Sequence, residues 1–367
     1  MHKRYNRQLI LKEFGAAGQQ KLLEAKVLVI GAGGLGCPAL QYLTAAGVGT
    51  IGLVDNDVVS VSNLHRQVLY STADVGQSKV LTAKERLSLL NPDASIVTYN
   101  ERINNLNALD IIEGYDIVID GTDNFASRYL INDACVILDK ALIYGAVSQF
   151  EGQVAIFNCR TDEAETAINY RDIFPEQPEE GTVLNCAEAG VLGVLPGVIG
   201  TMQANEAIKL ITGIGNPLIN SMLTFNALTN YVYKVELTAN ESSRALIPAD
   251  AAAFRKTNYD WQCKVEANGL EIDSDIFNRF INSSNTSIID IREYNEVPLV
   301  NEFPCVRSPL PELRKKIDSI HSENIILFCQ TGKRSLQAAQ LLQDTFGTSK
   351  KVYSLKGGII EWLYEHQ

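Results

Sequence analysis

The chain has 367 residues, 46% hydrophobic and 20% charged, the balance of an ordinary globular protein with two or three domains. Its net charge of −11 disfavours nonspecific nucleic-acid binding. The seven cysteines are scattered, odd in number and never spaced as C-x-x-C, which favours a reducing cytoplasm over a disulfide framework. The polar start, MHKRYNRQLI, is not a signal peptide, and the most apolar tract, Val191–Ile211, contains Pro196 and polar residues. We therefore expect a cytoplasmic protein without a membrane span.

Strand and helix patterns alternate through the first two hundred residues. We expect strands at Lys26–Ile30, Thr50–Val54, Ser95–Tyr99, Asp116–Asp120, Leu142–Tyr144 and Gln153–Phe157, with helices near Leu35–Ala46 and Lys79–Leu89. This alternation predicts a Rossmann-like, doubly wound, mostly parallel sheet with helices on both faces. Ligands of such sheets bind beyond the carboxyl ends of the strands, so residues that follow the strands should converge on one crevice.

A glycine-rich turn follows the first strand. Gly31, Gly33 and Gly36 spell G-x-G-x-x-G, and Asp55 lies 19 residues after the last of them. This is the fingerprint of a dinucleotide site, and one alternative is therefore an oxidoreductase that uses NAD or FAD. The pattern alone does not distinguish that site from an ATP site.

The segment after Asp55 favours ATP. Asn63, Arg66 and Gln67 follow it closely, and Lys79 begins the next helix. Two cations and a side-chain amide beside a glycine loop suit a triphosphate that is attacked at its α-phosphorus, because that reaction is catalysed by positioning and by neutralising phosphate charge.

A second acidic position follows the strand that ends at Asp120. Asp123, in D-G-T-D-N, is a candidate ligand for a Mg²⁺ ion that accompanies ATP, because Mg²⁺ prefers one or two carboxylates together with phosphate oxygens and water. The alternative is that Asp123 caps the helix expected from Phe125.

The pattern changes after residue 158. Cys159–Asn185 is a long polar stretch, typical of a lid or binding loop, and is followed by a helix near Met202–Thr212 and a strand pair around Leu223–Leu237. The pattern predicts a larger first domain over residues 1–240, a linker over 241–268 and a smaller domain over 269–367.

The last hundred residues form a smaller α/β pattern. Strands are expected at Ser287–Asp290, Ile325–Phe328 and Val352–Ser354, and helices at Ser335–Phe346 and Ile359–Tyr364. Between the second strand and the first helix lies a C-x-x-G-x-R loop, made of Cys329, Gln330, Thr331, Gly332, Lys333 and Arg334. A ring of backbone N–H groups, a helix N-terminus and two nearby cations favour the thiolate of such a cysteine and suit a bound thiosulfate or persulfide.

The first part of the chain resembles the ThiF/MoeB family, the bacterial relatives of ubiquitin-activating enzymes, over about residues 1–235. The motifs are RYNRQ, GAGGLG, LVDND, VSNLHRQ, VGQSKV, DGTDN and NCAEAGVLGVLPGVIG. The resemblance implies adenylation of the C-terminal glycine carboxylate of a small ubiquitin-like sulfur carrier. It puts Gly34 at the phosphates, Asp55 at the ribose, Asn63, Arg66 and Lys79 at the triphosphate, and Asp123 at the magnesium. It also implies a homodimer, because Arg7 of RYNRQ would reach the ATP of the partner subunit.

The chain departs from that family where many members bind zinc through two C-x-x-C pairs. The first pair is replaced by Asn169-Tyr-Arg-Asp172 and the second is reduced to Cys263, so no zinc is expected. Cys186, in LNCAEAG, lies where some relatives carry a thiol that links covalently to the carrier. An inert buried cysteine is the alternative, and the sequence leaves both open.

The C-terminal part resembles the rhodanese family over roughly residues 270–367, through IIDIREYNE, FCQTGKRS and LKGGIIEW. The resemblance makes Cys329 the sulfur-carrying residue, and Asp290 with Arg292 is expected to brace the loop as a buried ion pair. Together the two resemblances imply that a persulfide on Cys329 attacks an acyl-adenylate of the carrier, which yields a thiocarboxylate and AMP. A noncatalytic scaffold that only binds a partner is the remaining alternative. The sequence does not say whether the sulfur serves molybdopterin or the thiamine thiazole, nor which persulfide donor supplies it.

Overall fold

The computed structural model describes residues 3–160, 167–177, 190–259, 269–281, 283, 285–315, 320–347 and 349–365. These residues divide into two compact units, Met1–Tyr259 and Asp260–Gln367. Cys186, Cys263 and parts of the expected polar loop and linker lie outside the described residues.

The first unit is built on a sheet of eight strands in the order β3-β2-β1-β4-β5-β6-β7-β8. The strands are β1 (Lys26–Ile30), β2 (Thr50–Val54), β3 (Ser95–Tyr99), β4 (Ile117–Asp120), β5 (Ala141–Ser148), β6 (Glu151–Phe157), β7 (Ser221–Asn226) and β8 (Tyr231–Glu236). The strands from β3 to β5 in that order run parallel, and β6, β7 and β8 are antiparallel. Successive strands extend the sheet from β1 to β3 in one direction and from β4 in the other. The boundary between β1 and β4 is therefore the topological switch point where such sheets bind ligands.

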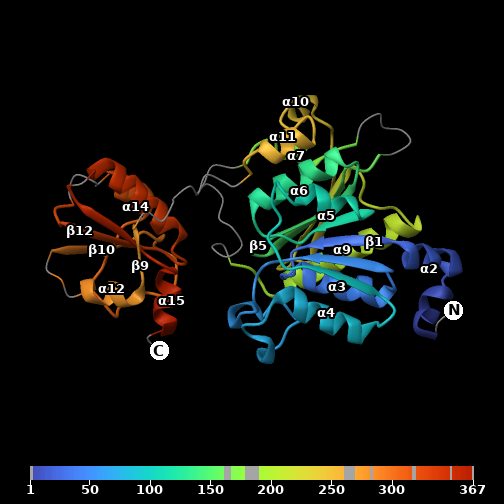
Figure 1. Ribbon diagram of the computed structural model, residues 1–367, viewed down its shortest axis with the longest axis horizontal. Helices are drawn as coiled ribbons and strands as arrows, with labels where there is room; N and C mark the ends of the chain where they lie inside the picture. Colours follow the sequence, from blue (N-terminus) through green and yellow to red (C-terminus); the bar gives the residue numbers. More distant parts are fainter. Residues whose placement is uncertain are drawn as a thin grey trace. The chain divides into compact units, whose positions relative to one another are not determined.

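Helices cover both faces of this sheet (Figure 1). One face carries α2 (Gly15–Glu24), α3 (Gly36–Ala46), α4 (Lys79–Leu90) and α9 (Val194–Thr212); the other carries α5 (Ala108–Glu113), α6 (Phe125–Ile137) and α7 (Tyr170–Ile173). Val27 and Val29 of β1 join the first core, whereas Leu28 and Ile30 join the second. Successive strand side chains point to opposite faces, so a continuously apolar strand serves both cores.

Two expectations for the first unit are corrected. Helix α9 begins at Val194 rather than near Met202, because Pro196 lies in the first turn, where its missing N–H costs no helical hydrogen bond. The expected linker, 241–268, starts too early. Residues 240–259 form α10 (Glu241–Arg244) and α11 (Ala251–Lys256), and Phe254 and Tyr259 are buried in the second core.

The second unit has a five-stranded parallel sheet in the order β11-β10-β12-β13-β9. Its strands are β9 (Glu271–Ile272), β10 (Thr286–Asp290), β11 (Val306–Arg307), β12 (Asn324–Phe328) and β13 (Lys351–Leu355), and its helices are α12 (Ser274–Ile281), α13 (Leu310–Lys315), α14 (Lys333–Phe346) and α15 (Gly358–Glu365). The three expected strands and two expected helices are confirmed, while β9, β11, α12 and α13 were not anticipated. In the part of the chain that the structure describes, no helix is both long and apolar enough to cross a membrane.

Candidate functional site

The three glycines of the turn after β1 have different structural roles. Gly31 has a φ of +98°, and a Cβ there would lie 2.7 Å from the Gly121 carbonyl oxygen. A Cβ on Gly36 would lie only 1.9 Å from the Gly31 carbonyl oxygen, whereas the nearest atom to a Cβ on Gly33 is Gln67 Nε2 at 3.7 Å. Gly31 and Gly36 therefore allow close packing of backbone, and Gly33 leaves open space in front of the loop.

That open space faces unused backbone donors. The N–H groups of Gly33, Gly34 and Leu35, just before α3, donate to no acceptor within the described residues. A Cβ on Gly34 would lie 2.9 Å from Pro196 Cβ and 3.5 Å from Arg66 Cγ, so the first turn of α9 and Arg66 both border the loop. Free N–H groups at a helix N-terminus form an anion site, and phosphate is the anion that most often occupies one after a strand and glycine turn.

Asp55 ties the end of β2 to the glycine loop. Its Oδ2 accepts a hydrogen bond from the Ala32 N–H and its Oδ1 accepts one from the Asp57 N–H, both at 2.8 Å. Burial raises the pKa of this carboxyl, against the opposing effects of the Lys79 charge and the two N–H donors. Tyr70 braces the same loop by donating from its hydroxyl to the Ala32 carbonyl at 3.1 Å.

The two cations of the segment are held in place by neighbours. Arg66 Nη2 donates to Asn63 Oδ1 at 3.0 Å, and Arg66 Nη1 lies 2.7 Å from His65 Nε2. Lys79 is 3% exposed, and its ammonium pairs with Asp57 at 2.8 Å. The sequence prediction did not assign Asp57 or His65 to these cations, because both pairings depend on how the loop folds.

Gln67 supplies a polar group without a protein partner. The residue is 4% exposed, its Nε2 lies beside the face of Gly33, and its Oε1 has no hydrogen-bond partner within the described residues. Because a buried unpaired amide oxygen costs free energy, its presence beside the open face of the loop marks a place where a ligand or a water binds.

The loop after β4 packs against the glycine loop from the other side of the switch point. Asp120 is buried, and its Oδ1 accepts from Thr122 N and Thr122 Oγ1 at 2.8 and 2.7 Å. The N-cap of α6 is Asn124, whose side chain accepts from the Ser127 N–H at 2.9 Å, so the capping role considered for Asp123 is filled by its neighbour. Asp123 is exposed and has no ion pair within the described residues.

Arg7 is the predicted nucleotide residue that this chain does not bring to its own crevice. It is exposed on α1 (Asn6–Leu9), and the neighbouring Gln8 donates to the Ala46 carbonyl at 3.1 Å. Ala46 ends α3, and the glycine loop lies at the start of that eleven-residue helix. Arg7 therefore sits at the far end of α3, about three turns away.

The segment where the first zinc-ligand pair was considered forms a hydrogen-bond network instead. The Asp172 carboxylate accepts from the N–H groups of Asn169 and Asn240 at 2.8 and 3.1 Å and from the Ser243 hydroxyl at 2.6 Å. This network joins α7 to α10, a segment that was predicted to belong to the linker. Within the described residues, no group of three or more His, Cys, Asp and Glu side chains is placed to hold a metal ion. The absence of zinc stays a prediction, since Cys263 is outside the described residues.

The second site surrounds Cys329, which directly follows β12 and is fully buried. The carbonyls of Cys329 and Gln330 accept from the Ile359 and Ile360 N–H groups at 2.9 and 3.3 Å, at the start of α15. The N–H groups of Thr331, Gly332 and Lys333 donate to no acceptor within the described residues. Because the carbonyls are hydrogen-bonded and the N–H groups are free, the loop has the positive potential expected of a site that binds an anion or a persulfide.

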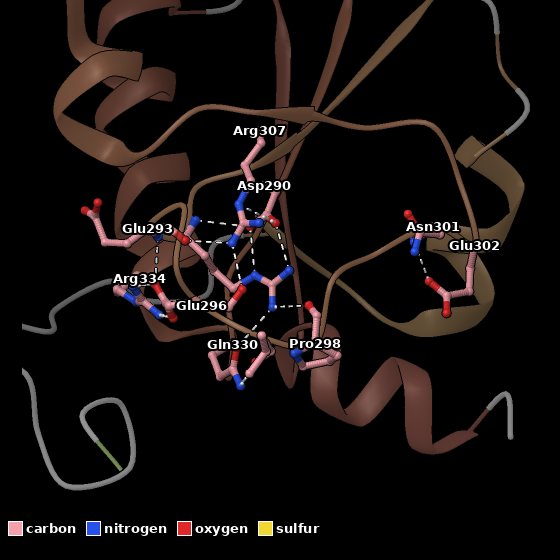
Figure 2. A network of polar contacts seen from close by, with 11 residues as sticks. Asp290, Glu293, Glu296, Pro298, Asn301, Glu302, Arg307, Gln330 and Arg334 are labelled. Atoms are coloured by element: carbon pink, nitrogen blue, oxygen red, sulfur yellow. Dashed lines mark hydrogen bonds and ion pairs between the residues drawn. The ribbon is translucent and has the colours of Figure 1, made fainter. Parts of the chain in front are cut away.

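One buried and one partly buried ion pair brace this loop (Figure 2). Arg292, which is fully buried, donates from Nε and Nη2 to the Asp290 carboxylate at 2.9 and 2.8 Å and from Nη1 to Gln330 Oε1 at 3.2 Å. The predicted Asp290–Arg292 pair is thus confirmed as a brace. Arg334 pairs through both terminal nitrogens with the Glu296 carboxylate, at 2.8 and 2.6 Å.

Glu296 was missed at the sequence level, where Arg334 was expected to act on the cysteine. Burial raises the pKa of Glu296, but hydrogen bonds from Arg334 and the Glu293 N–H and the nearby arginine charges outweigh it and lower the pKa overall. The available signal was the last of three acidic residues in IIDIREYNE, after the strand that neighbours the cysteine strand.

The first unit thus combines a doubly wound sheet with a glycine loop at its switch point, an arrangement typical of nucleotide-binding enzymes. The second unit presents a buried cysteine in the loop before a helix. Family comparison agrees: residues 5–245 match the ThiF family and residues 274–365 match the rhodanese-like domain. The chain belongs to the ThiF family and carries a rhodanese-like domain.

Several relatives are similar to this chain over most of their own length. A sulfur carrier protein adenylyltransferase of Thermus thermophilus is 49% identical, over 71% of this chain and 96% of the relative. A probable adenylyltransferase/sulfurtransferase, MoeZ, of Mycobacterium tuberculosis is 37% identical, over 99% of this chain and 93% of the relative. Among solved structures, E. coli MccB with ATP superposes with a TM-score of 0.57 at 23% identity, over 65% of this chain and 73% of that one, which supports the fold.

Proposed function

We propose that this protein couples the C-terminal Gly-Gly carboxylate of a ubiquitin-like sulfur carrier to AMP and then converts it to a thiocarboxylate with sulfur from Cys329. The adenylyltransferase and sulfurtransferase activities named for its relatives support this assignment. The observation that carries it is the meeting of the free N–H groups of Gly33 and Gly34 with Asp55 and two cations at one switch point.

In this proposal the protein positions ATP and neutralises its charge. The Asp55 carboxylate takes the ribose hydroxyls, the glycine-loop N–H groups and Gln67 take the phosphates, and Arg66 and Lys79 balance the charge that develops on the leaving pyrophosphate. Lys79 exchanges Asp57 for a phosphate oxygen, since both are anionic acceptors within its reach. Asn63 keeps Arg66 oriented through their hydrogen bond.

The donor set around Asp123 fits magnesium. Mg²⁺ prefers one or two carboxylates together with phosphate oxygens and water, and Asp123 is an exposed carboxylate with no ion pair within the described residues. When bound, the ion neutralises phosphate charge; Asp123 would hold it, and Asp120 would shape the turn that presents Asp123.

The reaction then proceeds by adenylation of the carrier, sulfur transfer and reduction. A carboxylate oxygen of the carrier attacks the α-phosphorus, an O–P bond forms and pyrophosphate leaves. The outer sulfur of the Cys329 persulfide attacks the acyl carbon, a C–S bond forms and AMP leaves with the electron pair of the broken C–O bond. A thiol reductant then cleaves the resulting disulfide, which releases the thiocarboxylate. The sulfur itself comes from a persulfide donor.

The proposal includes the oligomeric state and the cellular compartment. The protein acts as a homodimer in which Arg7 reaches the partner's ATP, because its own chain places it at the far end of α3 from the glycine loop. It works in the cytoplasm, where the cysteines that are free within the described residues remain reduced. The product serves the synthesis of molybdopterin or of the thiamine thiazole.

The test is pyrophosphate–ATP exchange with a purified carrier that ends in Gly-Gly. We expect Lys79→Ala and Asp123→Ala to reduce exchange at least tenfold, since each removes a charge that contacts the nucleotide or its metal. Lys84→Ala is the matched control, because Lys84 is an exposed lysine on the same helix, α4. Exchange that is unchanged in both site variants, or NAD binding without an ATP response, would overturn the proposal.

A further inference from the structure

Two buried serine hydroxyls stand behind Cys329. Ser335 is the third residue of α14, and Ser354 lies on the neighbouring strand β13; both are 0% exposed. Ser335 Oγ lies 3.6 Å from Cys329 Sγ and 2.8 Å from Ser354 Oγ. The hydroxyls therefore form a short chain that ends on the sulfur, in a place that water does not reach.

Each hydroxyl has one proton and a choice of acceptors. Ser335 donates either to the Gly332 carbonyl, 3.0 Å away, or to Cys329 Sγ. Ser354 donates either to Ser335 Oγ or to the same Gly332 carbonyl at 3.4 Å. The cluster has fewer protons than acceptors, so its hydrogen bonds rearrange without breaking any covalent bond.

The Gly332 carbonyl does not need the Ser335 proton. It already accepts the Leu336 N–H at 3.0 Å, which is the first hydrogen bond of the helix. When Ser335 turns its proton to the sulfur, no buried acceptor loses its last donor, and Ser354 still donates to the Ser335 oxygen. A serine hydroxyl that only hydrogen-bonds to its own helix needs no further partner. Ser335 Oγ, in contrast, contacts both the sulfur and a second buried hydroxyl.

We propose that Ser335 is a catalytic residue of sulfur transfer, which donates a hydrogen bond to Cys329 whenever this sulfur carries negative charge, and that Ser354 positions it. This inference rests on the proposed role of Cys329. With thiosulfate, the Cys329 thiolate attacks the outer sulfur, the S–S bond breaks, and its electron pair leaves with sulfite. With cyanide as acceptor, the persulfide S–S bond breaks, thiocyanate leaves, and the electron pair returns to Cys329 Sγ, where Ser335 stabilises it. The serine proton only reorients.

Within the described residues, the neighbouring arginine and lysine side chains do not replace the Ser335 hydroxyl at the Cys329 sulfur. Arg334 directs both terminal nitrogens to Glu296, and Arg292 directs Nε and Nη2 to Asp290. Lys333 is exposed at the start of the helix. The charged groups of the loop are thus bound to carboxylates or face solvent, while a fully buried hydroxyl contacts the sulfur itself.

The experiment compares full-length variants by two measurements. The first is the rate at which iodoacetamide alkylates Cys329, followed for that cysteine by peptide mass spectrometry between neutral and alkaline pH. The second is thiocyanate formation from thiosulfate and cyanide. Ser287→Ala is the matched control, because Ser287 and Ser322 form a similar hydroxyl pair, 2.7 Å apart, in the same unit but with no contact to Cys329.

We expect Ser335→Ala to slow both reactions about tenfold at neutral pH, which corresponds to the loss of one hydrogen bond to a charged group. Ser354→Ala should slow them about threefold. The alkylation deficit should vanish in alkaline buffer, because hydroxide ionises the thiol whether or not Ser335 is present to donate to the sulfur. A deficit caused by misfolding would persist in alkaline buffer. Unchanged neutral-pH alkylation in folded Ser335→Ala would overturn the inference. Sulfur transfer that survives Cys329→Ala would instead overturn the proposed function, and the alkylation result would stand apart from it.

Discussion

The glycine loop permits a substitution that separates binding from folding. A Cβ on Gly33 meets nothing closer than Gln67 Nε2 at 3.7 Å, and Gly33 does not have a positive φ. Gly33→Ala should therefore leave stability within about 1 kcal/mol of the parent, since Ala also restricts the unfolded chain. The same methyl group projects into the space where we place the phosphates.

The cost for ATP follows from the contacts that the methyl displaces. Phosphate oxygens need to approach the N–H groups of Gly33 and Gly34 to about 2.9 Å, and one lost charge-assisted hydrogen bond is worth about 1.5–3 kcal/mol. We therefore expect the ATP dissociation constant to rise about ten- to a hundredfold. Gly36→Ala should behave in the opposite way: its Cβ would lie 1.9 Å from a backbone oxygen, so the fold itself should lose several kcal/mol.

Isothermal titration with ATP and thermal unfolding of the full chain measure the two effects separately. Gly114→Ala is the control, because its Cβ would lie in open space, 3.9 Å from the Ile111 carbonyl oxygen, at the end of α5. A folded Gly33→Ala protein that binds ATP as tightly as the parent would refute the placement of the phosphates.

Three further outcomes follow from the charges described above. Because burial raises the pKa of Asp55, ATP affinity should fall as the pH drops through that pKa and the carboxylate loses its charge. Asp55→Asn should bind ATP about tenfold more weakly and should not show this pH dependence. Both effects are measured by titration with ATP across the pH range. The pKa of Glu296 is lowered, so its stabilisation is present above the ordinary value of 4.5 and is lost as the pH falls through the folded-state pKa. Glu296→Gln should lower the stability of the second unit by about 1–3 kcal/mol near neutral pH and weaken this acid dependence, followed by hydrogen exchange of β12 in urea. Metal chelators should leave the unfolding temperature unchanged. Asp172→Ala should lower the stability of the first unit by about 2–4 kcal/mol through its lost buried hydrogen bonds, with the exposed Asp93→Ala as control.

The parts of the fold that follow local pattern were predictable from sequence. β1, β2 and β3 match the expected ranges, and Asp55 follows its strand as expected, because apolar runs and turn residues determine them. The convergence of the glycine loop with the loop before Asp123 also follows, since the carboxyl ends of parallel strands share one edge.

The parts that depend on side-chain pairing were not predictable. Lys79 is held by Asp57, and Arg334 by Glu296, through contacts between segments that no periodicity relates. Residues 241–259 were predicted as linker because they are alanine-rich and polar, yet Phe254 and Ser243 attach them to the first unit. Ser335 follows the cysteine motif directly, but only the fold brings Ser354 to it.

The central claim is that the carrier's own carboxylate becomes joined to AMP. The most direct measurement uses a Gly-Gly carrier whose terminal carboxylate is labelled with ¹⁸O, turned over with ATP and a persulfide donor. The account predicts that the released AMP contains one labelled oxygen, because the carboxylate oxygen that attacks the α-phosphorus leaves with it. AMP without label, or label recovered in pyrophosphate, would contradict the account.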